Sequence, residues 1–322
     1  MNKPEARKHA HLGMTQLPLW WIRNEFPAWG HVYELAGLGF RSNARWADVG
    51  WREITLKDSK CRVWLDLSSA FERGTFFLGR YQELELELIM RAAIGPGDQF
   101  IDGGANIGLL SLLAASIVGP AGVVHAFEPN EAVYRRIEEH FKLNDLSQAV
   151  LHKVGLSDRP EELRFRILDG GPESGTLADL SDQQMDAVTT ELIVNVQPGD
   201  ELLFEQLSPA KRTMLKLDVE GFETQAVRGL AKTIDRLRPV ITTEYQQHLT
   251  KDEDVAALFE IMMERDYAAW LVGLRRTRGF SHELRLDPIA NAEVMRTQHE
   301  KCDVLWLAPE ARDLYQDAYT GA

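Results

Sequence analysis

The stretch QFIDGGANIGLLSLLA, residues 99–114, decides the fold. It places an acid, three glycines and an asparagine between a short apolar run and a helix-like run. A strand, a tight turn and a helix in this order are typical of open parallel sheets, which bind ligands outside the carboxyl ends of their strands. Glycine has no Cβ and tolerates positive φ, so a ligand can lie directly on the backbone of such a turn.

The spacing of the turn residues indicates which ligand it holds. A dinucleotide fingerprint requires G-x-G-x-x-G, but from Gly103 this chain reads G-x-A-x-x-G, with Ala105 where the middle glycine belongs. A nucleoside without phosphate instead needs an acid that receives a charged amino group, and Asp102 suits that role. We therefore expect S-adenosyl-L-methionine as the cofactor. The turn reads D-x-G-x-N-x-G, through Asp102, Gly104, Asn106 and Gly108.

Two further strand ends are expected to complete the cofactor site. The run GVVHAFEPN ends in Glu128, whose carboxylate can accept hydrogen bonds from both ribose hydroxyls, and Pro129 then stops the strand. After the third strand, residues 155–158 would lie over the adenine, with Gly155 and Leu156 against the ring and Ser157 or Asp158 at its amino group. The alternative makes Asp102 a helix cap, Glu128 a surface acid and residues 155–158 a plain loop.

The chain beyond residue 95 alternates strands with helices, which favours an α/β fold with a parallel sheet covered on both faces. The last two strands have no clear helix between them, so we expect them to pair antiparallel. Residues 169–188 and 273–300 do not fit the alternation and are predicted as long loops. Strands are predicted at Gln99–Asp102, Val123–Phe127, Ala149–Val154, Met214–Val219, Pro239–Tyr245, Tyr267–Val272 and Cys302–Leu307, and helices at Leu109–Val118, Glu131–Leu143, Glu223–Arg236 and Asp254–Arg265.

The first part of the chain differs in composition. Six of the eight tryptophans lie within the first 64 residues, and residues 52–67 are predicted to form two strands around a turn at Asp58–Lys60. We place an N-terminal α+β extension at residues 1–90, an S-adenosylmethionine-binding domain at 91–310 and a tail at 311–322. The tryptophans suit a small core, sugar stacking or a dimer contact, so a homo-oligomer stays open.

Charge and hydropathy restrict the partners. The 322 residues carry 49 acids and 36 bases, a net charge of −13, which disfavours nucleic acid as a partner. The N-terminus lacks the apolar segment of a signal peptide, and no run of about 18 apolar residues exists for a membrane span. With only two cysteines, the chain is expected to be cytoplasmic.

A second signature, MLKLDVEGFETQAVRGL at residues 214–230, precedes RPVITTEY. With FIDGGANIG and AFEPN, it closely resembles the FkbM family of S-adenosylmethionine-dependent methyltransferases, over about residues 78–308. In GRYQELE, Gln82 stands where the family usually has glutamate, and Glu83 follows. The matching positions are Asp102–Gly108, Phe127–Pro129, Asn144, Lys216–Glu223 and Glu244.

The resemblance implies a class I methyltransferase fold, Rossmann-like, with a seven-stranded, mostly parallel sheet in which one strand is antiparallel. It also implies an O-methyltransferase acting on a hydroxyl of a sugar, glycan or natural-product acceptor, with a cofactor contact at Tyr81. Two alternatives stay open: a nicotinamide-dependent oxidoreductase, which Ala105 disfavours, and a non-catalytic nucleoside-binding module of the same fold.

The end of the fourth strand carries the candidate catalytic residues. Lys216, Asp218 and Glu220 lie at i, i+2 and i+4, so they share one face if the strand persists. A buried lysine is costly unless it is paired, and we expect Asp218 or Glu244 as its partner. Asp218 is predicted beside the methyl donor, with Glu220, Glu223 and Glu244 as candidate bases. We expect no metal, because His248 and these carboxylates lack metal-ligand spacing.

Overall fold

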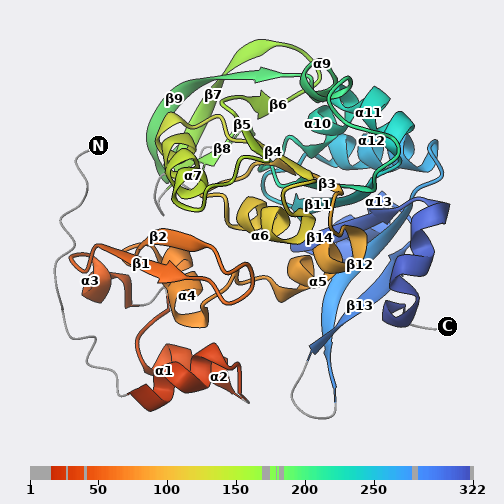
Figure 1. Ribbon diagram of the computed structural model, residues 1–322. Coiled ribbons are helices and arrows are strands. Elements are labelled where there is room, and N and C mark those ends of the chain that lie inside the picture. The colour runs from red at the N-terminus through yellow and green to blue at the C-terminus, as the bar shows by residue number, and fades with distance from the viewer. Residues whose placement is uncertain are drawn as a thin grey trace.

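The computed structural model describes residues 16–26, 28–39, 42–168, 175–178, 180, 185–277 and 282–319. In spatial order (Figure 1) the main sheet contains β13 (His282–Ile289), β12 (Ala268–Arg276), β14 (Lys301–Leu307), β11 (Val240–Gln246), β10 (Thr213–Leu217), β3 (Gln99–Gly103), β4 (Val123–Phe127) and β5 (Ala149–His152). Strands β5, β4, β3, β10 and β11 pair in parallel, and β14 runs antiparallel between β11 and β12. This is the α/β, Rossmann-like arrangement of class I methyltransferases.

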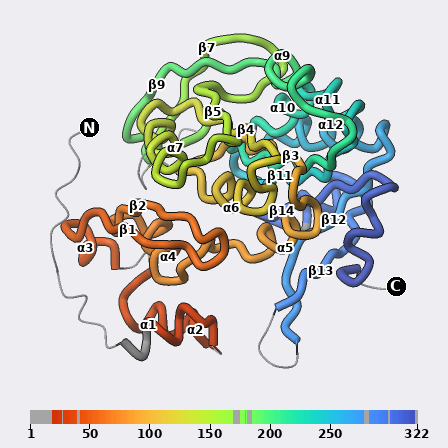
Figure 2. Tube along the Cα trace, viewed as in Figure 1, coloured from red at the N-terminus to blue at the C-terminus, as the bar shows by residue number. Residues whose placement is uncertain are grey.

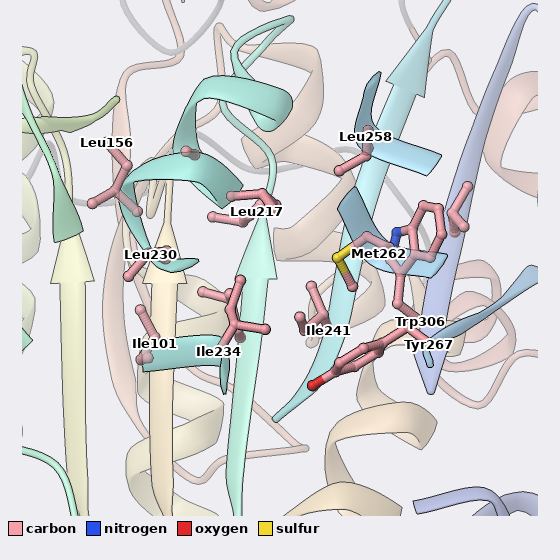
Figure 3. Packing of buried hydrophobic residues seen from close by; sticks show 14 of the residues in the cluster. Ile101, Leu156, Leu217, Leu230, Ile234, Ile241, Leu258, Met262, Tyr267 and Trp306 are labelled. Atoms are coloured by element: carbon pink, nitrogen blue, oxygen red, sulfur yellow. The ribbon is translucent and has the colours of Figure 1, made fainter. Parts of the chain in front are cut away.

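Helices cover both faces of this sheet because its central strands are apolar on both sides. Phe100 and Met214 face one layer of the core, whereas the next residues along, Ile101 and Leu215, face the other. Figure 3 shows the second layer, where Leu230, Ile234 and Met262 meet the sheet. The helices are α5 (Leu84–Ala93), α6 (Leu109–Val118), α7 (Glu131–Leu143), α9 (Gly199–Leu203), α10 (Glu223–Gly229), α11 (Ala231–Leu237), α12 (Asp252–Met263), α13 (Ala292–Gln298) and the 3₁₀ segment η2 (Pro309–Ala318).

The predicted strands and helices around the opening stretch are confirmed. Strand β4 and helices α6 and α7 have the predicted bounds, and β3 is one residue longer. The predicted antiparallel pairing of the last two strands is also confirmed, as β12 with β14. The helix predicted at residues 223–236 is broken into α10 and α11 at Leu230, whose φ of −109° and ψ of 10° are not helical.

The prediction of a long loop at residues 273–300 is wrong for residues 273–277 and 282–300; residues 278–281 fall outside the described residues. Strand β12 continues to Arg276 and pairs antiparallel with β13, and α13 follows. The sheet therefore has eight strands, one more than the expected seven. Charged residues alternate with apolar ones along HELRLDPI in β13, so its apolar content is too low to be recognised as a core strand.

A second sheet lies beside the main one and was missed. Its strands, in spatial order, are β6 (Gly155–Leu156), β9 (Val188–Gln197), β7 (Glu161–Leu168) and β8 (Gly175–Thr176). Strand β8 therefore lies within the loop predicted at residues 169–188, and β9 begins at the last residue of that range. Positions 169–174, 179 and 181–184 fall outside the described residues. Phe165, Ile167, Leu177, Val194 and Val196 form a small core of this sheet.

The N-terminal elements form a separate layer over α6 and α7 (Figure 2). The predicted hairpin is confirmed as β1 (Trp51–Thr55) paired antiparallel with β2 (Arg62–Asp66). Four helices accompany it: α1 (Gln16–Arg23), α2 (Trp29–Leu35), α3 (Asn43–Trp46) and α4 (Ala70–Leu78). Within the described parts of the chain, no helix is both long and apolar enough to cross a membrane.

Candidate active site

The turn after β3 passes directly under the end of β10. Gly104, Asn106 and Gly108 have φ values of +75°, +51° and +83°. A Cβ at Gly104 would lie 1.9 Å from the carbonyl oxygen of Asp218, so only glycine lets these two strand ends approach. The glycine thus serves a close backbone contact within the protein as well as the left-handed bend.

Glu128 binds the same turn from the end of β4. Its carboxylate accepts hydrogen bonds from the backbone N–H groups of Asn106 (3.2 Å) and Asn130 (2.9 Å). Burial raises the pKa of Glu128 to about 7. The sequence alternative of a surface acid is wrong, because only 6% of Glu128 is exposed.

Asp102 lies beneath the turn. It is fully buried, accepts a hydrogen bond from the Ser111 hydroxyl at 2.6 Å, and lies 3.4 Å from the Lys216 ammonium. The ammonium in turn donates to the carbonyl oxygen of Gly104 at 2.7 Å. Asp102 therefore contacts the Gly104 carbonyl of the turn only indirectly, through the Lys216 ammonium.

Lys216 is the cation at the centre of the site. Its side chain pairs with Asp218 at 3.5 Å, as expected, and with Asp102 in place of Glu244. Burial alone would lower the pKa of Lys216, but Asp218 and Asp102 outweigh it and hold the pKa above its usual range. The amine stays protonated, so it can orient and stabilise charge but cannot accept a proton.

Asp218, Glu220 and Glu244 come together, although not by the predicted route. Strand β10 ends at Leu217, and Glu220 adopts a left-handed φ of +53°. That bend, rather than a continuing strand, returns Glu220 to the other two, and one oxygen of each of the three lies within 4.8 Å of the others. The condition set for Lys216, Asp218 and Glu220 to share one face, a strand that persists to residue 220, is therefore not met.

Neighbouring groups neutralise these carboxylates. Lys301 pairs with Glu244 at 2.5 Å, and the Gln246 amide donates to both Glu244 and Glu220. Burial and the nearby Asp218 raise the pKa of Glu220 to about 9 and that of Glu244 to about 7. Lys301 was missed because it begins β14, far along the chain from Glu244, and meets Glu244 only through the β11–β14 pairing.

Two cavities meet at this point. The larger has a volume of about 320 Å³ and the smaller about 70 Å³. The predicted Tyr81, Ala105, Lys216 and Glu244 line the larger cavity. Glu128, Pro129, Gly155 and Leu156 line the smaller one. Both cavities share the residues Gly104, Asn106, Gly175, Asp218 and Glu220.

Four predicted cofactor residues contribute to neither lining. Asp102, Gly103, Gly108 and Ser157 lie behind the walls. A Cβ at Gly103 would meet Leu217 at 2.7 Å, so this glycine serves packing. Ser157 is fully buried, and its hydroxyl has no hydrogen-bond partner within the described chain.

Three further residues of the quoted motifs lie at or near the larger cavity: Tyr81, Glu83 and Glu223. Tyr81 donates its hydroxyl hydrogen to Glu83 at 3.1 Å. Glu223, a candidate base, lines neither of these two cavities and accepts hydrogen bonds from the N–H groups of Val219 and Gly221 instead. His248, which the sequence analysis considered only as a metal ligand, also lines this cavity. The sequence carried no periodic or motif signal for other lining residues, which include Phe71, Leu168, Thr176, Leu249 and Lys301.

The sheet order and the paired cavities at its carboxyl edge define a class I methyltransferase that uses S-adenosylmethionine. A model of the methyltransferase FkbM domain matches residues 102–269, more than half of the chain. The chain belongs to the FkbM methyltransferase family, as its sequence motifs predicted.

Other proteins resemble parts of this chain. "Methyltransferase 1" of Beauveria bassiana (strain ARSEF 2860) is 29% identical over 164 residues, which are 47% of this chain and 66%, just under two thirds, of that protein. Methyltransferase FkbM from Methylobacillus flagellatus KT superimposes with a TM-score of 0.37 at 14% identity, covering 85% of this chain and 59% of the other. An S-adenosylmethionine-dependent O-methyltransferase of Thermotoga maritima has a TM-score of 0.38 at 14% identity, covering 80% and 85%.

Proposed function

We propose that this chain transfers the methyl group of S-adenosylmethionine to a hydroxyl group of a sugar, glycan or natural-product-like small molecule. The observation that carries the proposal is the shared wall of the two cavities at Gly104, Asp218 and Glu220. A transfer reaction needs a donor and an acceptor to meet at one point, and alignment of the two provides much of the rate acceleration.

The residues of the smaller cavity fit the donor. Glu128 lies between the turn and residues 155–156, where its carboxylate can accept hydrogen bonds from ribose hydroxyls. Leu156, Phe165 and Leu177 provide apolar surface for an adenine ring. When bound, S-adenosylmethionine supplies a methyl group that its sulfonium centre activates. Lys216 would hold the turn in shape through the Gly104 carbonyl.

The larger cavity fits an acceptor rich in hydroxyl groups. Its carboxylates and amide offer many hydrogen-bond acceptors and donors, and Phe71 and Tyr81 add ring surfaces. The Asp218 side chain is 31% exposed and lines both cavities. We place the reacting hydroxyl at this carboxylate, where Asp218 orients it and accepts its proton as the methyl group is transferred.

The other carboxyl groups would support this step. Glu220 has a pKa of about 9, so its neutral form can donate a hydrogen bond to an acceptor hydroxyl. Burial and Asp218 raise the pKa of Glu244 to about 7, and Lys301 pairs with it. The protonation state of Glu244 would therefore set how much negative charge lies beside Asp218.

The test is methyl transfer itself. Purified chain is incubated with methyl-labelled S-adenosylmethionine and panels of glycans, hydroxylated metabolites and amines, and products are identified by mass spectrometry. We expect a label on oxygen of a hydroxylated small molecule. A product labelled on nitrogen would contradict the O-methylation proposal, and an absence of any transfer despite donor binding would support a non-catalytic module.

A further inference from the structure

The outer edge of strand β2 is bound by side chains of helix α7 and its cap. Asn144, the helix cap, accepts a hydrogen bond from the Arg62 N–H at 2.7 Å and donates to the Arg62 carbonyl at 2.8 Å. One turn earlier, His140 accepts from the Trp64 N–H at 3.1 Å. Arg136, another turn earlier, forms an ion pair with Glu72 at 2.6 Å. This i, i+4, i+8 row docks the N-terminal hairpin onto the methyltransferase core.

Of the three residues in this row, His140 alone also contacts the turn between β3 and α6 within the described structure. Its Nδ1 lies 2.9 Å from the carbonyl oxygen of Ile107. Ile107 belongs to the turn between β3 and α6, residues 104–108, which we call the donor turn because we place the methyl donor there. A carbonyl can only accept, so Nδ1 carries the hydrogen. In the neutral ring, Nε2 is then free to accept from Trp64. The imidazole thus joins a backbone N–H of β2 to a backbone carbonyl of the turn.

The surroundings keep this ring in one state and one place. Only 2% of His140 is exposed, and burial lowers its pKa to about 4, so the ring is neutral near pH 7. Ile107 is buried in the same core cluster as Val63, Leu65 and Ile137. The carbonyl of Ile107 and the N–H of Asn106, which Glu128 binds, belong to adjacent residues of one turn.

We propose that His140 is a positioning residue for the methyl donor: by donating to the Ile107 carbonyl it holds the donor turn in the shape that binds the donor, while its other nitrogen is held by the Trp64 N–H of strand β2. The inference rests on the proposed placement of the donor at this turn and is independent of the acceptor.

The test compares S-adenosylhomocysteine binding in three variants by calorimetry, well below each melting temperature. His140→Leu removes both hydrogen bonds and should weaken binding about fivefold. His140→Gln retains one donor and one acceptor and should restore most of the affinity. Asn144→Ala loosens the hairpin but does not touch the turn, so it should lower the melting temperature while binding stays within about twofold of wild type.

Two outcomes would overturn the proposal. One is wild-type affinity in His140→Leu, and the other is an equal loss in Asn144→Ala and His140→Leu, which would show a general effect of instability. Should His140→Leu fail to fold, His140→Asn replaces it, because the shorter amide cannot reach both partners. Failure of the wild-type chain itself to bind S-adenosylhomocysteine would instead refute the donor placement, and this inference with it.

Discussion

Asp218 lines both cavities, and one of its oxygens pairs with Lys216. Asp218→Asn keeps the shape but removes the negative charge and the proton acceptor. We expect the turnover number to fall by about 100-fold or more, a larger effect than the loss of unfolding free energy from the weakened Lys216 pair, because Asp102 still pairs with Lys216. Methyl transfer at saturating donor measures the effect.

The matched control is Asp235→Asn, the same substitution at a position whose side chain is 56% exposed and pairs with Arg265. It should leave turnover unchanged. A fully active Asp218→Asn variant would remove Asp218 from the proposed reaction.

Glu128 combines a structural and a binding role in one carboxylate. Glu128→Ala should weaken S-adenosylhomocysteine binding by roughly 1–3 kcal/mol, because the ribose hydroxyls and the Asn106 N–H lose their acceptor. Calorimetry measures this loss. Glu128→Gln retains one acceptor oxygen and should bind with intermediate affinity, whereas unchanged affinity in Glu128→Ala would contradict the assignment of the ribose to this side chain.

The carboxylates Asp218, Glu220 and Glu244 have the closeness of a metal site, yet they carry their own counter-charges in Lys216 and Lys301. We therefore predict that methyl transfer survives exhaustive treatment with a chelator. The measurement is turnover before and after chelation, with a magnesium add-back. Loss of activity that magnesium restores would show that these carboxylates bind a metal.

At the level of elements, the crossing of the β3 turn and the end of β10 allows a sharp test. Gly104→Ala places a methyl group 1.9 Å from the Asp218 carbonyl oxygen, and should cost about 3 kcal/mol or more of unfolding free energy. Gly97→Ala is the control, because Gly97 also has positive φ (+87°) but has nothing within 4 Å of a Cβ.

Gly97→Ala should therefore cost only the backbone strain, about 1 kcal/mol. Urea denaturation of both variants measures the difference. Equal losses would mean that the Gly104 contact relaxes freely and that the two strand ends do not constrain one another.

The elements that could be predicted from sequence share one property: a regular apolar pattern that faces one of the core clusters. Strand β4 and helices α6 and α7 were predicted to the residue for this reason. Strand β7, with EELRFRIL, and strand β13, with HELRLDPI, expose one face and carry charge along it. Their pairing depends on partners elsewhere in the chain, so local pattern could not distinguish them from loops.

For the whole molecule, buried carboxyl groups outside any ion pair determine the pH response above neutrality. The pKa of Glu128 is raised to about 7 and that of Glu223 to about 8, both from 4.5, mainly by burial. Stabilisation from such groups is complete below pH 4.5 and is lost as the pH rises through 7 and 8. The buried His125 and His140, with pKa values lowered to about 4 from 6.5, stay neutral over this range.

We therefore expect the ligand-free chain to lose about 2 kcal/mol of unfolding free energy between pH 6.5 and 8.5. Urea denaturation at the two pH values measures this loss. Glu223→Gln should make the profile shallower, since it removes one of the titrating groups. A profile that does not change over this interval would contradict the burial of these carboxyl groups as ionisable groups.

The sequence by itself determined the fold class, the cofactor and the family, because the donor turn and the strand ends are contiguous motifs whose chemistry is local. Only the tertiary structure decided that Lys216 pairs with Asp102, that Lys301 neutralises Glu244, and that His140 joins the hairpin to the donor turn. These contacts join residues that are distant along the chain or lie on different elements, and burial there makes electrostatic partners depend on packing rather than on spacing.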